Sequence, residues 1–419
     1  MADPLTPTSD FDALLDVLPA GWEQLAHKLK AIGTDKSSKI KDPRVLMRAL
    51  MTHVGCDIPL RQTVAVLAEA EVIDINHVNL HRRMKKAGPL IQELVSRLGA
   101  RRSEVVRDRW GGYVPILLDG SVVVTPKYNE WNGRLHAAMR LPDQCIVQAH
   151  ISTTQTGESL KRFSFERGDL AVGDRGFANP VGVQSVLAQG ADVLVRVNRS
   201  SLPLYAEGTD EALNIHTWVQ GLGDNKRTHA RPVYTQGPRT ARIDGRLIAK
   251  RLPHKKRSEA RKRARAEFGN DDVALELSEW LILFTTTAKA RLSDTLCIEL
   301  YRLRWQVELL FKRMKSLSNL GALPNHRPES VLTWLGLKVL LYMCAECLAQ
   351  PPSSPAIRGF SPLFTFRQEN ALRPELGTTT LEIDESHVAA RCGRRASYAP
   401  GRGRATGAST CRASVQLPS

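Results

Sequence analysis

The spacing of apolar residues changes along the chain and divides it into segments of different kinds. From residue 43 to 99 apolar positions recur at helical intervals, with short breaks near Gly55 and Asp74. From 111 to 198 short apolar runs alternate with helix-like stretches, and several short strand-like runs follow up to about 275. The pattern predicts an α/β protein: a helical N-terminal region (1–110), an α/β core (111–198 and 277–350) and a mostly β insertion within that core (199–276).

Two apolar runs in the core each lead into an aspartate. Residues 113–118 precede Asp119-Gly-Ser, and residues 170–173 precede Asp174-Arg-Gly-Phe. A strand that ends in a carboxylate places that group rigidly, and a nearby glycine lets the backbone approach a metal or phosphate. Either aspartate alone is more often a turn residue. We further predict strands at 135–141, 145–151 and 193–197, and helices at 158–163 and 180–189.

The segment 300–315 has the periodicity of one helix with two different faces. One face is apolar: Leu300, Leu303, Val307, Leu310 and Met314. The other carries a carboxylate among cations and a tyrosine: Tyr301, Arg304, Glu308, Lys312 and Lys315. Such a face suits metal-dependent phosphodiester chemistry, because a carboxylate can hold a cation and basic groups can hold a DNA backbone. A surface helix with an ordinary charged face is the plainer alternative.

Taken together, Asp119, Asp174 and Glu308 resemble the acidic triad of DDE transposases, which have a ribonuclease-H-like core. The segment Tyr301-x2-Arg304-x3-Glu308-x6-Lys315 matches the Y-R-E-K signature of the insertion-sequence 4 family of bacterial transposases at every defined position. The Asp174-Arg-Gly-Phe string is similar to the second-aspartate motif of that family. The resemblance spans roughly residues 40–345.

The resemblance implies an enzyme that cuts DNA, forms and reopens a hairpin, and joins the ends to target DNA. In it, Asp119, Asp174 and Glu308 are the catalytic residues and hold two Mg²⁺ ions, for which Mn²⁺ can substitute. Its DNA partners are inverted-repeat transposon ends and a target, bound by a homodimer in a synaptic complex. The residues expected to contact DNA are Tyr301, Arg304, Lys315, Trp280, Lys312 and Arg175.

Trp280 opens a predicted strand, and its position has two interpretations. It lies 21 residues before Tyr301, the separation at which relatives carry a tryptophan that stacks on a base flipped out of the transposon end. Hairpin formation bends one strand sharply, and an unstacked base needs an aromatic surface. The alternative is ordinary core packing.

The charge of the chain favours a polyanionic partner. Lys and Arg number 59 against 43 Asp and Glu, a formal net charge of +16. Residues 61–70 and 77–87 have helix-turn-helix spacing, and the second run is basic. The run 250–265 is strongly basic and predicts an element that follows phosphates, with a solvated helix or a linker as the alternatives.

No apolar run of about 18 residues and no signal peptide are recognised in the sequence, which predicts no membrane association and a cytoplasmic, nucleoid-associated enzyme. The tail, 351–419, contains Arg but no Lys and is rich in Ala, Gly, Pro and Ser, so we expect disorder. Relatives continue there with helices that assist dimerisation. This departure keeps two alternatives open: a truncated, non-catalytic copy that binds ends and inhibits transposition, and a structure-specific nuclease of the same fold.

Overall fold

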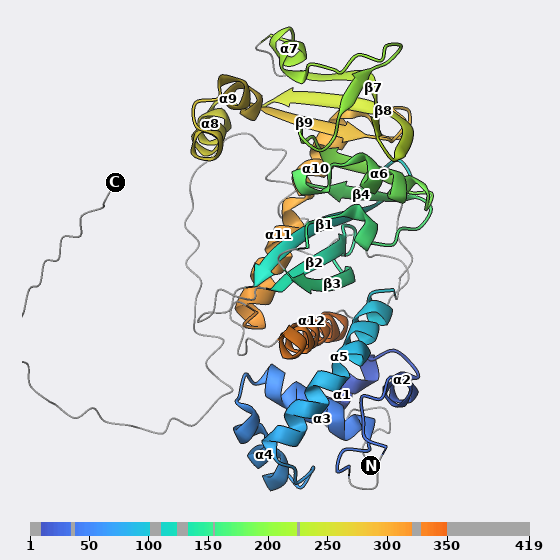
Figure 1. The fold of residues 1–419 in the computed structure, drawn as a ribbon, viewed down its shortest axis with the longest axis vertical. Coiled ribbons are helices and arrows are strands. Elements are labelled where there is room, and N and C mark those ends of the chain that lie inside the picture. The colour runs from blue at the N-terminus through green and yellow to red at the C-terminus, as the bar shows by residue number, and fades with distance from the viewer. Residues whose placement is uncertain are drawn as a thin grey trace, which may run out of the picture. The chain divides into compact units, whose positions relative to one another are not determined.

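A computed structural model describes residues 10–34, 38–100, 110–123, 133–153, 156–223, 227–320 and 328–349 (Figure 1). The tail for which disorder is predicted lies outside these ranges. The described residues form a mixed α/β structure in which an N-terminal helical region is followed by a nine-stranded mixed sheet.

The N-terminal region contains α1 (Asp10–Val17), α2 (Trp22–Lys28), α3 (Pro43–Gly55), α4 (Leu60–Glu69) and α5 (His77–Ala100). The predicted helix-turn-helix pair corresponds to α4 and the first part of α5. Three basic residues of α5 contact other parts of the protein: His81 Nε2 lies 2.9 Å from Ser330 Oγ, Arg83 donates to Ser38, and Lys85 pairs with Glu329. Arg82 and Lys86 are exposed. Helix α5 therefore does not leave all of its basic side chains free to contact DNA, as a recognition helix would.

The sheet has the strand order β3-β2-β1-β4-β5-β9-β8-β7-β6. Its members are β1 (Val114–Val123), β2 (Gly133–Arg140), β3 (Ile146–Thr153), β4 (Asp169–Gly173), β5 (Asp192–Arg196), β6 (Leu204–Ala206), β7 (Thr228–Gly237), β8 (Thr240–Arg251) and β9 (Trp280–Thr285). Strands β1, β4 and β5 are parallel, and every other pairing is antiparallel. The strands predicted in the core are confirmed.

Of the two helices predicted between residues 111 and 198, one is confirmed and the other is much shorter than expected. α6 (Pro180–Leu187) forms as predicted, with Asn179 as its N-cap. The segment 158–163 yields only the 3₁₀ turn η2 (Leu160–Arg162). Leu160 and Phe163 are both buried, and Phe163 is extended, which ends the helical turn after three residues.

The segment 199–276 does not form a sheet of its own. Strand β8 pairs with β9 along Arg246–Arg251, so β6, β7 and β8 extend the core sheet. The segment also contains α7 (Ile215–Gln220), α8 (His254–Phe268) and α9 (Asp272–Ser278). Most of the basic run forms α8, which excludes the alternative of a linker, and the prediction that it follows phosphates stays a prediction. Only Ala264 of α8 is buried, which leaves most of its cations accessible.

Two apolar clusters lie on the two faces of the sheet because strand side chains alternate. Leu117, Val172 and Leu194 belong to a cluster with the N-terminal helices and with α10 (Asp294–Leu303), α11 (Trp305–Leu317) and α12 (Pro328–Ala349). Ile116, Val193 and others belong to a second cluster with α6 and α7. The first face therefore anchors α11, which carries Glu308.

Helix α12 corrects the expectation that no apolar run is long enough to span a membrane. Residues Glu329–Ala349 meet the length and composition of a spanning helix, with a mean hydropathy of 1.6 in their most apolar window. That window is 67% buried inside the protein. The helix packs on α5 and β3, and its buried Lys338 forms an ion pair with Asp57 at 2.7 Å. These contacts are those of a core helix.

Candidate active site

Asp119 and Asp174 lie at equivalent positions along two neighbouring parallel strands. Asp119 is in β1, and Asp174 directly follows β4. Leu117 of β1 is in register with Val172 of β4, and each aspartate follows two residues later. The prediction that both lie at strand ends holds for Asp174 and is wrong for Asp119. Strand β1 continues as the antiparallel partner of β2, so Asp119 lies within it, opposite Ala137. The parallel pairing nevertheless ends just before both carboxylates, which places them at one edge.

Each aspartate is oriented by a backbone N–H that lies one or two residues further along the chain. Gly120 N donates to Asp119 Oδ1 at 2.9 Å, and Gly176 N donates to Asp174 Oδ1 at 2.9 Å. Asp174 caps a short 3₁₀ turn, η3 (Arg175–Phe177). One oxygen of each carboxylate is thereby fixed, while Asp174 forms no ion pair with the described residues.

The helix predicted across 300–315 is two helices that meet at Arg304. Arg304 N donates to Tyr301 O and Val307 N donates to Arg304 O, so 3₁₀-type bonds replace the helical ladder there. The predicted apolar face is confirmed, since Leu300, Val307, Leu310 and Met314 are all buried. Helix α11 packs along β1 and β2 (Figure 1) and brings Glu308 to the aspartates.

Arg304 connects two of the three predicted catalytic carboxylates. Its Nη1 lies 3.6 Å from Asp119 Oδ2, and its Nη2 donates to Glu308 Oε1. The side chain is only 15% exposed, and Nη1 is buried without a hydrogen bond. Within the described part of the chain no three His, Cys, Asp or Glu side chains enclose a metal ion as they stand. The Arg304 guanidinium thus lies between two of the three carboxylates.

The site concentrates negative charge. The pKa of Asp119 is raised to about 6, chiefly by burial and to a smaller extent by the carboxylates of Asp174 and Glu308, while Arg304 and the Gly120 N–H oppose the rise. Glu158, between β3 and η2, belongs to the same site, because burial and then Asp174 and Asp119 raise its pKa to about 7. No periodicity or motif in the sequence marks Glu158, so sequence reasoning missed it.

The residues predicted to contact DNA have different surroundings. Tyr301 and Arg304 are half-buried and line a cavity of about 220 Å³ together with Lys250, Arg251 and Lys256. Lys312 and Lys315 are exposed on α11, one and two turns beyond Glu308. Tyr301 and Arg304 therefore lie close to the carboxylates. Lys312 and Lys315 lie further along the exposed surface of α11.

Trp280 and Arg175 line a second cavity, of about 570 Å³. The Trp280 side chain is only 5% exposed, and the Arg251 guanidinium lies 5.7 Å from the centre of its ring. Further cations at this cavity are Arg196, Arg199, Lys256 and Arg263. Burial lowers the pKa of Arg196, and the neighbouring charge of Arg175 lowers it further. The sequence did not single out Arg196, which forms part of β5 and follows an apolar run like any strand residue.

Glu279 holds the basic helix α8 against this cavity. Its carboxylate accepts from Arg261 at 2.6 Å and from Arg251 at 2.8 Å, and Arg257 lies 3.9 Å away. These contacts lower the pKa of Glu279 although burial opposes them. Because Glu279 immediately precedes Trp280, one buried carboxylate fixes α8 next to the tryptophan.

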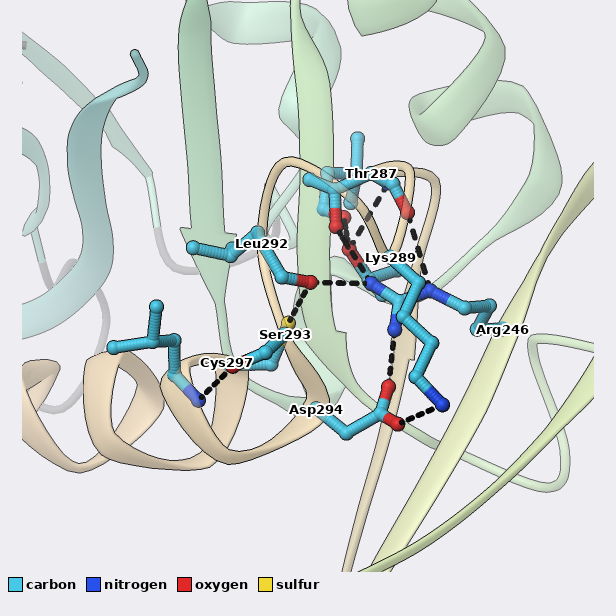
Figure 2. A network of polar contacts seen from close by, with 10 residues as sticks. Arg246, Thr287, Lys289, Leu292, Ser293, Asp294 and Cys297 are labelled. Atoms are coloured by element: carbon cyan, nitrogen blue, oxygen red, sulfur yellow. Dashed lines mark hydrogen bonds and ion pairs between the residues drawn. The ribbon is translucent and has the colours of Figure 1, made fainter. Parts of the chain in front are cut away.

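A polar network fixes the start of α10, the first of the two helices that lead to Glu308 (Figure 2). Arg246 of β8 donates to Thr287 O at 3.2 Å and to Leu292 O at 2.8 Å, and forms an ion pair with Asp294. Lys289 lies 3.3 Å from the same carboxylate. Asp294 is the first residue of α10, so the network ties the insertion strand β8 to the helix that leads into Arg304 and α11.

Residues 110–344 match the family model described as the transposase DDE domain. The chain is 28% identical over 328 residues to the transposase InsL of insertion sequence element IS186A from Escherichia coli K12, covering 75% of this chain and 86% of the relative. It is also 28% identical over 329 residues to the transposase of insertion sequence element IS421 from Escherichia coli, with the same coverage. A piggyBac transposase synaptic complex with hairpin DNA aligns over 89% of this chain and 85% of its own, with 10% identity and a TM-score of 0.37, too low a similarity to guide assignments.

Proposed function

This chain belongs to the family of transposases with a DDE domain, and on that premise we propose that it moves an insertion sequence of the insertion-sequence 4 family by a cut-and-paste reaction. The observation that carries the proposal is the position of its three acids. Asp119 and Asp174 follow paired positions of parallel strands, and α11 brings Glu308 to them across the sheet. Acids on strands and a packed helix are held more rigidly than acids on loops.

The strand order supports a ribonuclease-H-like core. Three antiparallel strands, β1 to β3, are followed by β4 and β5, which lie parallel to β1 in the order β3-β2-β1-β4-β5. The strands β6 to β8 enter the chain between Asp174 and Glu308. This is the position at which the proposed family carries its β insertion.

Asp119, Asp174 and Glu308 would hold two Mg²⁺ ions, because carboxylate oxygens are the ligands that this hard cation prefers. The donor set fits such a site, since three carboxylates lie together there, and the buried Arg304 Nη1 that lacks a hydrogen bond suits an acceptor such as a phosphate oxygen. Bound ions of this kind activate an attacking water or 3′-hydroxyl and stabilise the leaving 3′-oxygen. For the carboxylates to accept a cation, the Arg304 guanidinium has to turn from Asp119 and Glu308 towards a DNA phosphate. Mn²⁺ would substitute for Mg²⁺.

The DNA would run from the carboxylates over the exposed lysines of α11 and the cations of α8. Both cavities beside the site are lined by arginine and lysine, which suits a phosphate backbone. A homodimer in a synaptic complex, inverted-repeat ends, a target DNA and a cytoplasmic location at the nucleoid complete the proposal.

Lys315→Gln should weaken binding of end DNA and reduce the slope of log affinity against log salt by about one. The expected cause is the loss of one phosphate contact, because Lys315 is exposed on α11 beyond Glu308. Lys312→Gln should behave alike. Lys28→Gln in α2 removes the same charge from another exposed position and serves as the control. Equal slopes for Lys315→Gln and the wild type in a salt titration would assign Lys315 a structural role.

Trp280→Leu should slow hairpin formation by roughly 5- to 150-fold and leave the first nick nearly unchanged, because base stacking contributes about 1–3 kcal/mol. Leucine is chosen because Trp280 is only 5% exposed, so alanine would remove packing as well as the aromatic face. Trp218→Leu, at a half-buried tryptophan of α7, is the matched control. Equal slowing of nick and hairpin, together with a lower melting temperature, would identify Trp280 as a packing residue only.

The proposed function as a whole is tested with duplex DNA that carries the inverted repeats flanking the gene. With Mg²⁺ the protein should nick one strand at the repeat end, convert the end to a hairpin and then join it to a target. Denaturing gels resolve each product. Tight binding of the ends without any nick would favour the non-catalytic inhibitor, and cleavage set by DNA structure without regard to the repeat would favour the nuclease.

A further inference from the structure

Glu158 brings a fourth carboxylate to the edge of the sheet where Asp119 and Asp174 lie. It precedes η2, and its neighbours fix its position firmly. Leu160 is fully buried, Ser159 Oγ accepts from Lys161 N, and the Arg162 guanidinium donates to Gly157 O at 3.2 and 3.3 Å. The backbone on both sides of Glu158 is therefore held in place by packing and hydrogen bonds.

The Glu158 carboxylate lies between strand β1, which carries Asp119, and the turn that Asp174 caps, and two glycines make room for it. A Cβ built at Gly120 would lie 2.7 Å from Glu158 Oε1, and one built at Gly176 would lie 2.1 Å from Glu158 Oε2. Both separations are shorter than atoms tolerate. Each oxygen of Glu158 thus occupies space that a side chain would otherwise fill, beside Asp119 on one side and Asp174 on the other.

Two of the four carboxylates at this place form no ion pair with the described part of the protein. Arg304 forms ion pairs with Asp119 and Glu308. Neither Glu158 nor Asp174 has an ion-pair partner among the described residues, although Arg134 and Arg304 lie near enough to act on Glu158 through space. Both carboxylates lie close to Gly176, and two neighbouring carboxylates repel one another, which a proton on one of them or a cation between them relieves.

We propose that Glu158 is a fourth ligand of the cation site, holding a divalent cation together with Asp174 either directly or through a bound water. The inference rests on the proposed function, because it assumes that Asp119, Asp174 and Glu308 form that site. It adds a carboxylate from the connection between β3 and η2 to the three predicted ligands.

The test is Mn²⁺ binding to the full-length protein without DNA, measured by titration calorimetry or by the loss of the free-ion magnetic resonance signal. Glu158→Gln keeps the size and removes the charge, and it should weaken Mn²⁺ binding by about 10- to 100-fold. Glu207→Gln, at an exposed glutamate after β6, removes the same charge elsewhere and should bind as the wild type does. Melting curves confirm that each variant is folded.

A second variant reaches the same carboxylate without removing any acid. Gly176→Ala places a methyl group against Glu158 Oε2 and should displace the carboxylate, which also weakens Mn²⁺ binding. The effect of Gly176→Ala should disappear when Glu158→Ala is already present, because no side chain is then left to displace. This pair decides the matter even if Glu158→Gln does not fold.

Asp174→Asn separates failure of this inference from failure of the proposed function. If Asp174→Asn weakens Mn²⁺ binding while Glu158→Gln and Gly176→Ala bind within twofold of the wild type, Glu158 is not a ligand and the three-carboxylate site stands. If the wild type binds no Mn²⁺, or Asp174→Asn binds as well as the wild type, both are overturned.

Discussion

Asp119→Asn, Asp174→Asn and Glu308→Gln should each reduce Mg²⁺-dependent cleavage of end DNA by about 1,000-fold or more, since a bound cation supplies several kcal/mol of transition-state stabilisation. Binding of the ends should persist, because each change removes a negative charge and no phosphate contact. The two aspartates follow paired strand positions, and Glu308 contacts Asp119 through Arg304, so loss of any one acid leaves an incomplete site.

Strand cleavage and gel-shift binding are measured on the same DNA for this prediction. Asp244→Asn, at an exposed carboxylate of β8 paired with Arg242, is the control and should cleave as the wild type does. Near-normal cleavage by any one of the three variants would remove that residue from the catalytic set. Loss of binding along with cleavage would indicate misfolding, which a melting curve detects.

Arg246→Met should destabilise the protein by about 3–5 kcal/mol, the usual cost of breaking a buried ion pair. The Arg246 and Asp294 side chains are only 13% and 14% exposed, and the variant leaves Asp294 and the Leu292 carbonyl without their main donor (Figure 2). Because Asp294 begins α10, cleavage should fall as well, through misplacement of α11 and Glu308.

Arg242→Met is the matched control for Arg246→Met. Arg242 lies on the same strand and pairs with Asp244 at 2.7 Å, but the two side chains are 47% and 75% exposed. Its loss should change the melting temperature much less, since solvent screens exposed pairs. Equal shifts in thermal unfolding for the two variants would show that the network does not hold α10.

The sequence predicts those parts of the site that depend on apolar residues recurring at a fixed spacing. The apolar runs before Asp119 and Asp174 become β1 and β4, and the apolar stripe from Leu300 to Met314 is buried as expected. The spacing of apolar residues indicates which face of its helix or strand each residue lies on. The apolar face is then the one that is buried. The strands, the position of Asp174 directly after β4 and that of Glu308 on a helix follow from this.

Other features depend on contacts between distant segments, which periodicity does not encode. The break at Arg304 leaves the helical spacing of side chains unchanged, so no pattern reveals it. Asp119 lies within β1 because β2 pairs beyond it, and Gly120 does not end the strand. Glu158 reaches the site from the connection between β3 and η2, which has no regular structure. Its position there is recognised from its close approach to Gly120 and Gly176 in the folded protein. The membership of β6 to β8 in the core sheet likewise depends on β8 pairing with β9.

The central claim is that Asp119, Asp174 and Glu308 hold the cations that cleave DNA, and a change of metal preference tests it most directly. Each acid is replaced by Cys in turn, and cleavage of end DNA is compared in Mg²⁺ and in Mn²⁺. A thiolate is a softer ligand that suits Mn²⁺ better than Mg²⁺. We predict that Asp174→Cys is inactive in Mg²⁺ and regains cleavage in Mn²⁺, whereas undiminished cleavage in Mg²⁺ would contradict the account.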